Sequence, residues 1–325
     1  MKYLILIFTY IAFVSQSCSN NTSTDDQTYN AKFIELDGSS TVFPIAQEIV
    51  NSYHAFNPDI KMSLSLSGTS NGFMKFCQGQ LEINNASRPI ENDEIEMCKR
   101  NGVEFLELKI GFDAIVLAVN PTNTWCNQLD IEQLKNIWNT EREIRWSELD
   151  PNWPKAKITF FCPGRLSGTA DVFTKILFQG NNGYMKKSVT SEDHNDIVMS
   201  ISRDTFSIGF FSLPYLHSNL SFVKPLSIDD LDSTNGTGFI SPTFDAIESH
   251  SYNPFQRPLF LYINKKILSS EAHYDFLRYF LVSSREIGRN VGYAPFDKNS
   301  MNYELAKLEK AWKEQQPRAG KGDWL

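Results

Sequence analysis

Three short clusters of Gly, Ser and Thr stand between strand-like and helix-like runs of this chain. They are Gly38-Ser39-Ser40-Thr41, Ser67-Gly68-Thr69-Ser70-Asn71-Gly72 and Ser167-Gly168-Thr169. A helix N-terminus leaves backbone N–H groups unpaired and carries about half a positive charge. Glycine lets an anion approach closely there, and hydroxyl groups add donors. Each cluster alone fits an ordinary helix N-cap. Together, the three clusters predict a site for an oxyanion.

An arginine in the segment INNASRPIE could supply the positive charge of such a site. Arg88 precedes Pro89, and a residue before proline is biased towards extended backbone. Its guanidinium fork can hold two oxygens of one anion. A surface ion pair is the alternative use of this side chain.

The elements that would position these residues alternate between strand and helix patterns, which is typical of an α/β fold. Two similar apolar runs, AIVLAVN (114–120) and PLFLYIN (258–264), have the composition of buried strands. We interpret them as two crossings between a discontinuous first domain, 31–118 plus 259–325, and an inserted second domain, 119–258. Two sequential domains or one large sheet are the alternatives. The run 104–120 is expected to form two strands separated near Gly111.

Composition narrows the class of protein. The chain has 325 residues, 41% hydrophobic and 21% charged, with a formal net charge of −7. This length suits one large or two ordinary globular domains. The acidic balance and the lack of a basic tract argue against nucleic acid as a partner.

The N-terminus has the pattern of an export signal. Lys2 is followed by an apolar run of about 12 residues, shorter than the roughly 20 that span a membrane. Residues 1–17 are therefore predicted to be a signal peptide. Cys18 resembles a bacterial lipoprotein cleavage site, which predicts a lipidated Cys18 and a tether over 18–30. A secreted protein with unmodified Cys18 is the alternative.

The other four cysteines would then lie in an oxidising compartment. Of the three pairings that they allow, the sequential one is preferred, Cys77–Cys98 with Cys126–Cys162. A zinc site is disfavoured because no C-x-x-C occurs and the five histidines are scattered. We expect no metal and no cofactor.

An ordered set of segments makes the chain similar to a known family. The segments are GSSTVFP, SGTSNGF, FCQGQLEINNASRPI, NGVEFLEL, FDAIVLAVNP, LDIEQLKNIW, PGRLSGTADVF and IGFF. Together they resemble the phosphate-binding protein of the bacterial ABC phosphate importer, from about residue 34 to GYAPF and the helix after it. The resemblance implies a class II periplasmic-binding-protein fold. In such a fold two α/β domains, each a mixed sheet flanked by helices, are joined by two hinge strands and close over one phosphate. The resemblance also favours the sequential disulfides.

The resemblance further implies which residues contact the anion. These are Ser40, Thr41, Thr69, Ser70, Ser87, Arg88, Asp113, Ser167, Gly168 and Thr169, with Ser39 and Arg165 as further candidates. The chain departs from the family where P-G-T-D-S-G-T is usual, because Arg165-Leu166 replaces Thr-Asp. An acidic acceptor would recognise the proton that phosphate keeps and sulfate lacks. Asp113 could be that acceptor, or a structural carboxylate near the hinge.

The resulting hypothesis is an extracytoplasmic, lipid-anchored monomer that binds inorganic phosphate and delivers it to ABC permease subunits. The alternatives are a binding protein for another tetrahedral oxyanion or a phosphate ester, and a lipid-anchored phosphate-binding or adhesion module without a transporter. An enzyme is disfavoured because the pair S-x-x-K with K-T-G and the motif H-E-x-x-H are absent from the sequence.

Overall fold

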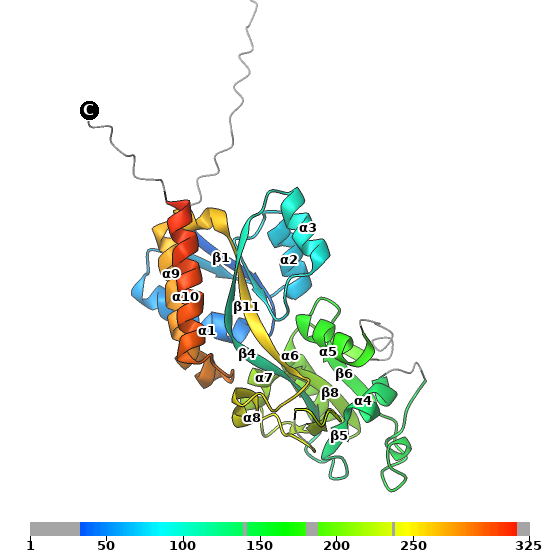
Figure 1. Cartoon of the computed structure of the whole chain (residues 1–325). Helices are drawn as coiled ribbons and strands as arrows, with labels where there is room; N and C mark the ends of the chain where they lie inside the picture. The colour runs from blue at the N-terminus through cyan, green and yellow to red at the C-terminus, as the bar shows by residue number, and fades with distance from the viewer. Residues whose placement is uncertain (1–32, 139–141, 180–187, 236–237, 317–325) are drawn as a thin grey trace, which may run out of the picture. The chain divides into compact units, whose positions relative to one another are not determined.

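Local sequence explains the first strand and helix of the computed structural model, which describes residues 33–138, 142–179, 188–235 and 238–316 (Figure 1). Strand β1 (Phe33–Gly38) leads into helix α1 (Phe43–Phe56), which has a proline in its first turn. The buried residues of α1 recur at helical spacing: Ile45, Ala46, Ile49, Val50 and Tyr53. The helix that this spacing indicates is therefore confirmed.

Strands of the first half of the main sheet lie in the order β2-β1-β3-β11-β4. We call these strands, with the N-terminal part of β4, the first half-sheet. Its bounds besides β1 are β2 (Lys61–Leu64), β3 (Ile83–Ala86), β4 (Phe105–Val119) and β11 (Gln256–Asn264). Strand β1 is parallel to β2 and β3, and β11 is antiparallel to β3 and β4.

Helices flank the first half-sheet. They are α1, α2 (Thr69–Cys77), α3 (Asn92–Arg100), α9 (Glu271–Val291) and α10 (Lys298–Gln315), with a 3-10 turn at Lys265–Ser269. Helix α1 packs on α9, and α9 on α10, whereas α2 packs on β3 and α3 (Figure 1).

The C-terminal part of β4 continues into a second half-sheet with the order β4-β8-β6-β7. Its strands are β6 (Thr159–Pro163), β7 (Ser188–Ser191) and β8 (Ser207–Ser212); β9 (Lys224–Pro225) also pairs with β4. A small separate sheet joins β5 (Gln128–Asp130) to β10 (Ser227–Asp229). The helices are α4 (Ile131–Trp138), α5 (Gly168–Phe178), α6 (His194–Arg203), α7 (Leu213–His217) and α8 (Phe244–Glu248), with a 3-10 turn at Trp146–Glu148.

Strand β4 joins the two half-sheets without interruption. Its residues 105–114 pair with β11, and residues 115–119 pair with β8. The predicted break near Gly111 is therefore wrong. The irregularity is a bulge in β4 itself: Gly111 and Lys109 pair with the consecutive residues Leu259 and Phe260 of β11, so Ile110 is an extra residue and the pairing resumes on both sides of it. Contacts group Ala31–Leu325 into one compact unit, so the predicted domain boundaries stay a prediction.

One of the two predicted disulfides is confirmed. Cys77, the last residue of α2, is bonded to Cys98 in α3. The pair Cys126–Cys162 is wrong, because both cysteines are free and buried. The thiol of Cys126 lies 3.9 Å from the Gln128 carbonyl oxygen, whereas Cys162 lies in β6 and bonds to Ser188 of neighbouring β7. Burial raises the pKa of each thiol to about 12.

The predicted signal peptide (1–17), the lipidated Cys18 and the tether (18–30) lie outside the described residues. Within the described part of the chain, no helix combines the length and the apolar character needed to cross a membrane.

Candidate anion-binding site

Hydroxyl groups from four segments meet between the two half-sheets. The segments follow β1, β2, β3 and β6, and ligands of open α/β sheets bind beyond the carboxyl ends of such strands. The hydroxyl of Thr41 lies 2.9 Å from that of Thr169, and the hydroxyl of Thr69 lies 3.2 Å from that of Ser87. We call the buried members the hydroxyl cluster: Ser39, Ser40, Thr41, Thr69, Ser87, Ser167 and Thr169. The structure thus brings together most of the predicted contact residues.

Two glycines make this close approach possible. A Cβ atom on Gly168 would lie 2.5 Å from the Ser87 hydroxyl and 2.8 Å from that of Thr69. Gly38 has φ +124°, and a Cβ there would lie 2.3 Å from the Asn85 carbonyl oxygen. A larger residue at either position would push the loops apart.

Some of the cluster hydroxyls satisfy nearby backbone groups. Ser167 is the N-cap of α5 and accepts from the backbone N–H of Thr169 at 3.2 Å. Ser39 accepts from the N–H of Thr41 at 3.1 Å. The N-cap residues of α1 and α2 make no side-chain cap. In the first turns, the N–H of Ile45 bonds to Tyr293 and that of Ser70 to the Leu166 carbonyl oxygen. The partial positive charge of both helix N-termini still favours an anion nearby.

An arginine that the sequence reasoning missed lies against the hydroxyl cluster. Arg257, in β11, is 4% exposed and pairs in register with Asp113 of β4, which is 0% exposed. Its Nη2 donates to the hydroxyls of Thr41 at 3.0 Å and Thr169 at 2.6 Å, and its Nη1 donates to the Gly168 carbonyl oxygen at 3.0 Å. Arg257 therefore connects both half-sheets at the point where β4 passes from one to the other.

Asp113 holds this guanidinium in place. Its Oδ2 accepts from Nε and Nη2 of Arg257 at 3.1 and 2.9 Å, and its Oδ1 accepts from the N–H of Leu213 at 3.1 Å. Complete burial raises the pKa of Asp113, while Arg257 opposes that shift. With a backbone bond from Ala114 as well, about four acceptor positions of the carboxylate are in use. Asp113 is thus placed to orient Arg257.

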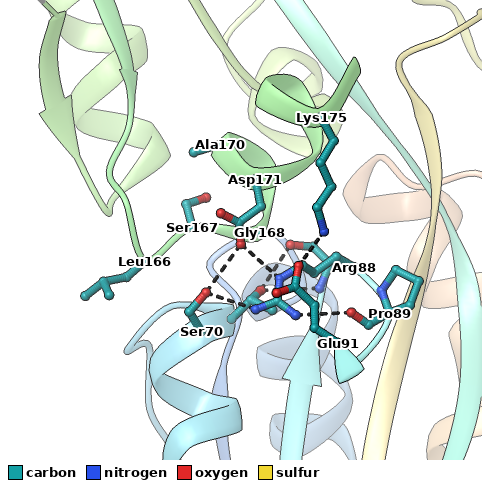
Figure 2. A network of polar contacts seen from close by, with 12 residues as sticks. Ser70, Arg88, Pro89, Glu91, Leu166, Ser167, Gly168, Ala170, Asp171 and Lys175 are labelled. Atoms are coloured by element: carbon teal, nitrogen blue, oxygen red, sulfur yellow. Dashed lines mark hydrogen bonds and ion pairs between the residues drawn. The ribbon is translucent and has the colours of Figure 1, made fainter. Parts of the chain in front are cut away.

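Arg88 lies in a separate polar network beside the hydroxyl cluster (Figure 2). Its Nε donates to Asp171 of α5, and its two terminal nitrogens donate to Glu94, Ser70 and the Pro89 carbonyl oxygen. These are five bonds, which use all five N–H donors of an arginine. Burial lowers the pKa of Arg88, but Glu94 and Asp171 outweigh this and raise it.

The same network contains contacts between α2–α3 and α5. The hydroxyl of Ser70 donates to Asp171 at 3.3 Å, and Lys175 pairs with Glu91 (Figure 2). We call Arg88–Asp171 and Glu91–Lys175 the latch. Ser70 and Arg88 therefore belong to contacts that hold the two halves together.

The departure from the family pattern lies at the edge of the site. Arg165 is exposed and has no hydrogen bond or ion pair with any other described residue. Leu166 is 38% exposed, and its carbonyl oxygen accepts from the N–H of Ser70 at 3.2 Å. Neither side chain takes the place of the missing acid.

Three aromatic side chains that the sequence reasoning did not assign hold the loop before α1. The hydroxyl of Tyr215 donates to the Ser40 carbonyl oxygen at 2.8 Å, and that of Tyr293 donates to the Thr41 carbonyl oxygen. His194 Nε2 lies 3.4 Å from the Ser40 hydroxyl oxygen. Burial, helped by the charge of Arg257, lowers the pKa of His194 to about 3. The sequence offered no local signal for these three.

A metal site is not formed by the part of the chain that the structure describes, because it has no group of three or more His, Cys, Asp or Glu residues that could hold an ion. The site is therefore described by its hydroxyl groups, helix ends and Arg257.

Comparisons with known proteins agree with this architecture. The family model described as "PBP superfamily domain" matches residues 19–285. Protein SphX of Synechocystis is 34% identical over 85% of this chain and 81% of its own length. The phosphate-binding protein PstS of Staphylococcus saprophyticus is 31% identical over 85% of this chain and 84% of its own length.

Solved structures show the same fold. A possible phosphate binding protein from Planctomyces limnophilus has a TM-score of 0.64 and 29% identity, and covers 86% of this chain and 98% of its own. An ABC-type phosphate transport receptor from Vibrio cholerae has a TM-score of 0.61 at 20% identity, with 80% and 98% covered.

Fold and matches together define the class, and the chain is a member of the PBP superfamily with the predicted mixed α/β fold. Within that superfamily it belongs to the family of the SphX and PstS proteins. The predicted resemblance is confirmed, and so is the expectation of a binding protein rather than an enzyme.

Proposed function

We propose that the chain binds inorganic phosphate at the hydroxyl cluster. The observation that carries the proposal is the meeting of buried hydroxyls from both half-sheets with the guanidinium of Arg257. Neutral donors and one partly compensated positive charge can hold a dianion without a large net charge in the site. Membership of the SphX and PstS family supports phosphate as the ligand.

The proposed contact set amends the one expected from the sequence. Ser40, Thr41, Thr69, Ser87, Ser167, Gly168 and Thr169 remain proposed contacts, with Ser39 beside them. Arg257 supplies the positive charge, and Asp113 orients it. Ser70 and Arg88 act in closure, and Arg165 stays outside the site.

The proposed motion is a closure of two domains about β4 and β11. The pairing of β4 passes from β11 to β8 between Ala114 and Ile115, and β11 begins opposite this point, at Gln256; both positions are close to the predicted boundaries at 118 and 259. Donors on both sides of this hinge complete the anion's contacts only when the domains close. We propose 31–118 plus 259–325 and 119–258 as these domains.

Isothermal titration calorimetry of the purified protein with phosphate tests the proposed ligand. We expect a Kd in the micromolar range or below, and sulfate is the matched competitor. Tight sulfate binding with no heat from phosphate would reject phosphate as the ligand. The alternative of another tetrahedral oxyanion or a phosphate ester is favoured by one observation, the exposed Leu166 in place of the usual acid.

Delivery to ABC permease subunits, and a lipid anchor on Cys18 of a monomer, complete the proposal. Relatives described as phosphate-binding proteins and as an ABC-type phosphate transport receptor support delivery. Metabolic labelling with a fatty acid, in the wild type and in Cys18→Ser, tests the anchor. If the Cys18→Ser variant still incorporates the labelled fatty acid, the lipid is attached to another residue. An adhesion module without a transporter predicts instead that deletion leaves phosphate uptake unchanged.

A further inference from the structure

His194 is a buried polar side chain that the proposed phosphate site does not yet use. It is the first residue of α6, is 0% exposed, and lies between the two half-sheets. One ring nitrogen faces the backbone of Ser212, and the other faces the hydroxyl of Ser40. A buried histidine with both nitrogens near polar partners has a definite hydrogen-bonding role.

The two partners fix which nitrogen carries the proton. The backbone N–H of Ser212 lies 3.2 Å from Nδ1 and can only donate, so Nδ1 must accept. A neutral imidazole then has its proton on Nε2, the nitrogen 3.4 Å from the Ser40 hydroxyl oxygen. His194 is therefore the donor, and the oxygen of Ser40 is the acceptor.

A hydroxyl that accepts from one neighbour keeps its own proton to donate elsewhere. We propose that His194 is a positioning residue of the anion site. It does not contact the ligand itself but turns the O–H of Ser40 towards the bound anion. The proposal rests on the proposed function, because it assigns a direction to one of the donors of the hydroxyl cluster.

Tyr215 reinforces this arrangement from the same side. Its ring centroid lies 5.0 Å from that of His194, and its hydroxyl donates to the Ser40 carbonyl oxygen at 2.8 Å. His194 and Tyr215 come from α6 and α7 of the second half, whereas Ser40 belongs to the first. The backbone carbonyl and the hydroxyl of Ser40 thus both accept hydrogen bonds from residues across the proposed hinge, so the direction of the Ser40 O–H is fixed only when the halves close.

Two amide substitutions separate the donor from the acceptor of the imidazole. In His194→Gln the amide nitrogen can reach the place of Nε2 and still donate to Ser40. In His194→Asn the amide oxygen can take the place of Nδ1 and accept from Ser212, but nothing reaches Ser40. Each variant loses one buried hydrogen bond, so both are expected to lose similar stability.

Phosphate affinity is expected to separate them. We expect the Kd from calorimetry to rise about tenfold in His194→Asn and to stay within about threefold of wild type in His194→Gln. In a Ser40→Ala background, His194→Asn should cause no further loss. If both variants lose phosphate affinity equally, or if His194→Asn lowers affinity as much in the Ser40→Ala background as in the wild type, the histidine acts only by packing.

The tautomer gives an independent readout. Nitrogen-15 NMR of the ligand-free wild type should show a neutral ring with its proton on Nε2, and a proton on Nδ1 would overturn the proposal. If the wild type binds neither phosphate nor sulfate, the proposed function fails and the inference with it. If the wild type binds phosphate and the Gln and Asn variants do not separate, only the inference fails.

Discussion

At the scale of single residues, two arginines have opposite uses although each precedes a proline. Arg88 comes before Pro89 and Arg257 before Pro258, and both side chains are almost fully buried. The argument that singled out Arg88, an extended backbone before proline, applies equally to Arg257. What the sequence could not show is the pairing partner, because Asp113 and Arg257 are 144 residues apart.

Substitution of Arg257 tests its proposed role. Arg257→Lys keeps the charge but loses the fork that bonds Asp113, Thr41 and Thr169 together. We expect phosphate affinity to fall by about tenfold or more, since lysine cannot make these directed bonds at once. The matched control, Arg165→Lys, changes an exposed arginine and should leave the calorimetric Kd unchanged. Equal effects of the two substitutions would exclude Arg257 from the site.

The pH dependence of the free energy of unfolding should reveal the lowered pKa of His194. Its pKa is lowered to about 3 in the folded protein, by burial and by Arg257, from an ordinary value of about 6.5. Below about pH 6.5 the unfolded chain takes up a proton that the folded protein excludes, so stability falls as the pH falls towards 3. From pH 7.5 to pH 5 this costs about 2 kcal/mol. Urea unfolding measures the free energy of unfolding at both pH values. Its decrease from pH 7.5 to pH 5 should be smaller by that amount in His194→Gln than in the wild type, and an equal decrease in both proteins would contradict the lowered pKa.

At the scale of elements, the sequence was most informative where a pattern was local. The amphipathic spacing of α1 and the loops after β1, β2 and β6 were all readable from short segments. Predictions failed where a distant partner decides the outcome. Strand β4 continues past Gly111 because a bulge at Ile110 lets its pairing with β11 resume. Cys126 and Cys162 are both free, and each thiol has its own nearby partner, Gln128 and Ser188 respectively.

The latch, which joins the segment between β3 and α3 to α5, is expected to stabilise the closed arrangement. Asp171→Asn removes the charge that pairs with Arg88 at 2.9 Å, while Arg88 keeps its partner Glu94. We expect phosphate affinity to fall about fivefold with faster release, because the bond spans the two halves and is only partly exposed. Stopped-flow release measures the rate. The control Glu96→Gln breaks a solvent-exposed pair within α3. If this control changes the affinity and the release rate as much as Asp171→Asn does, the latch does not contribute to closure.

At the scale of the whole molecule, the site depends on how few strands connect its halves. Among the strands that the structure describes, only β4 contributes long segments to both half-sheets, and β11 begins opposite the point of β4 where its pairing passes to β8. Arg257 and Asp113 therefore lie at the proposed hinge and in the proposed anion site together. We expect a ligand that binds Arg257 to act on the same residues that would bend, and so to couple binding to closure.

Closure can be followed between two labelled positions. We choose Lys99→Cys in α3 and Glu143→Cys in the second half, whose side chains are 65% and 72% exposed. Buried Cys126 and Cys162, with pKa values near 12, should not react with the dyes, and Cys18→Ser removes the remaining thiol. We expect phosphate to raise the energy-transfer efficiency, and Asp171→Asn to lower it before phosphate is added. Binding by calorimetry without any change in transfer would mean that the halves do not move about β4 and β11.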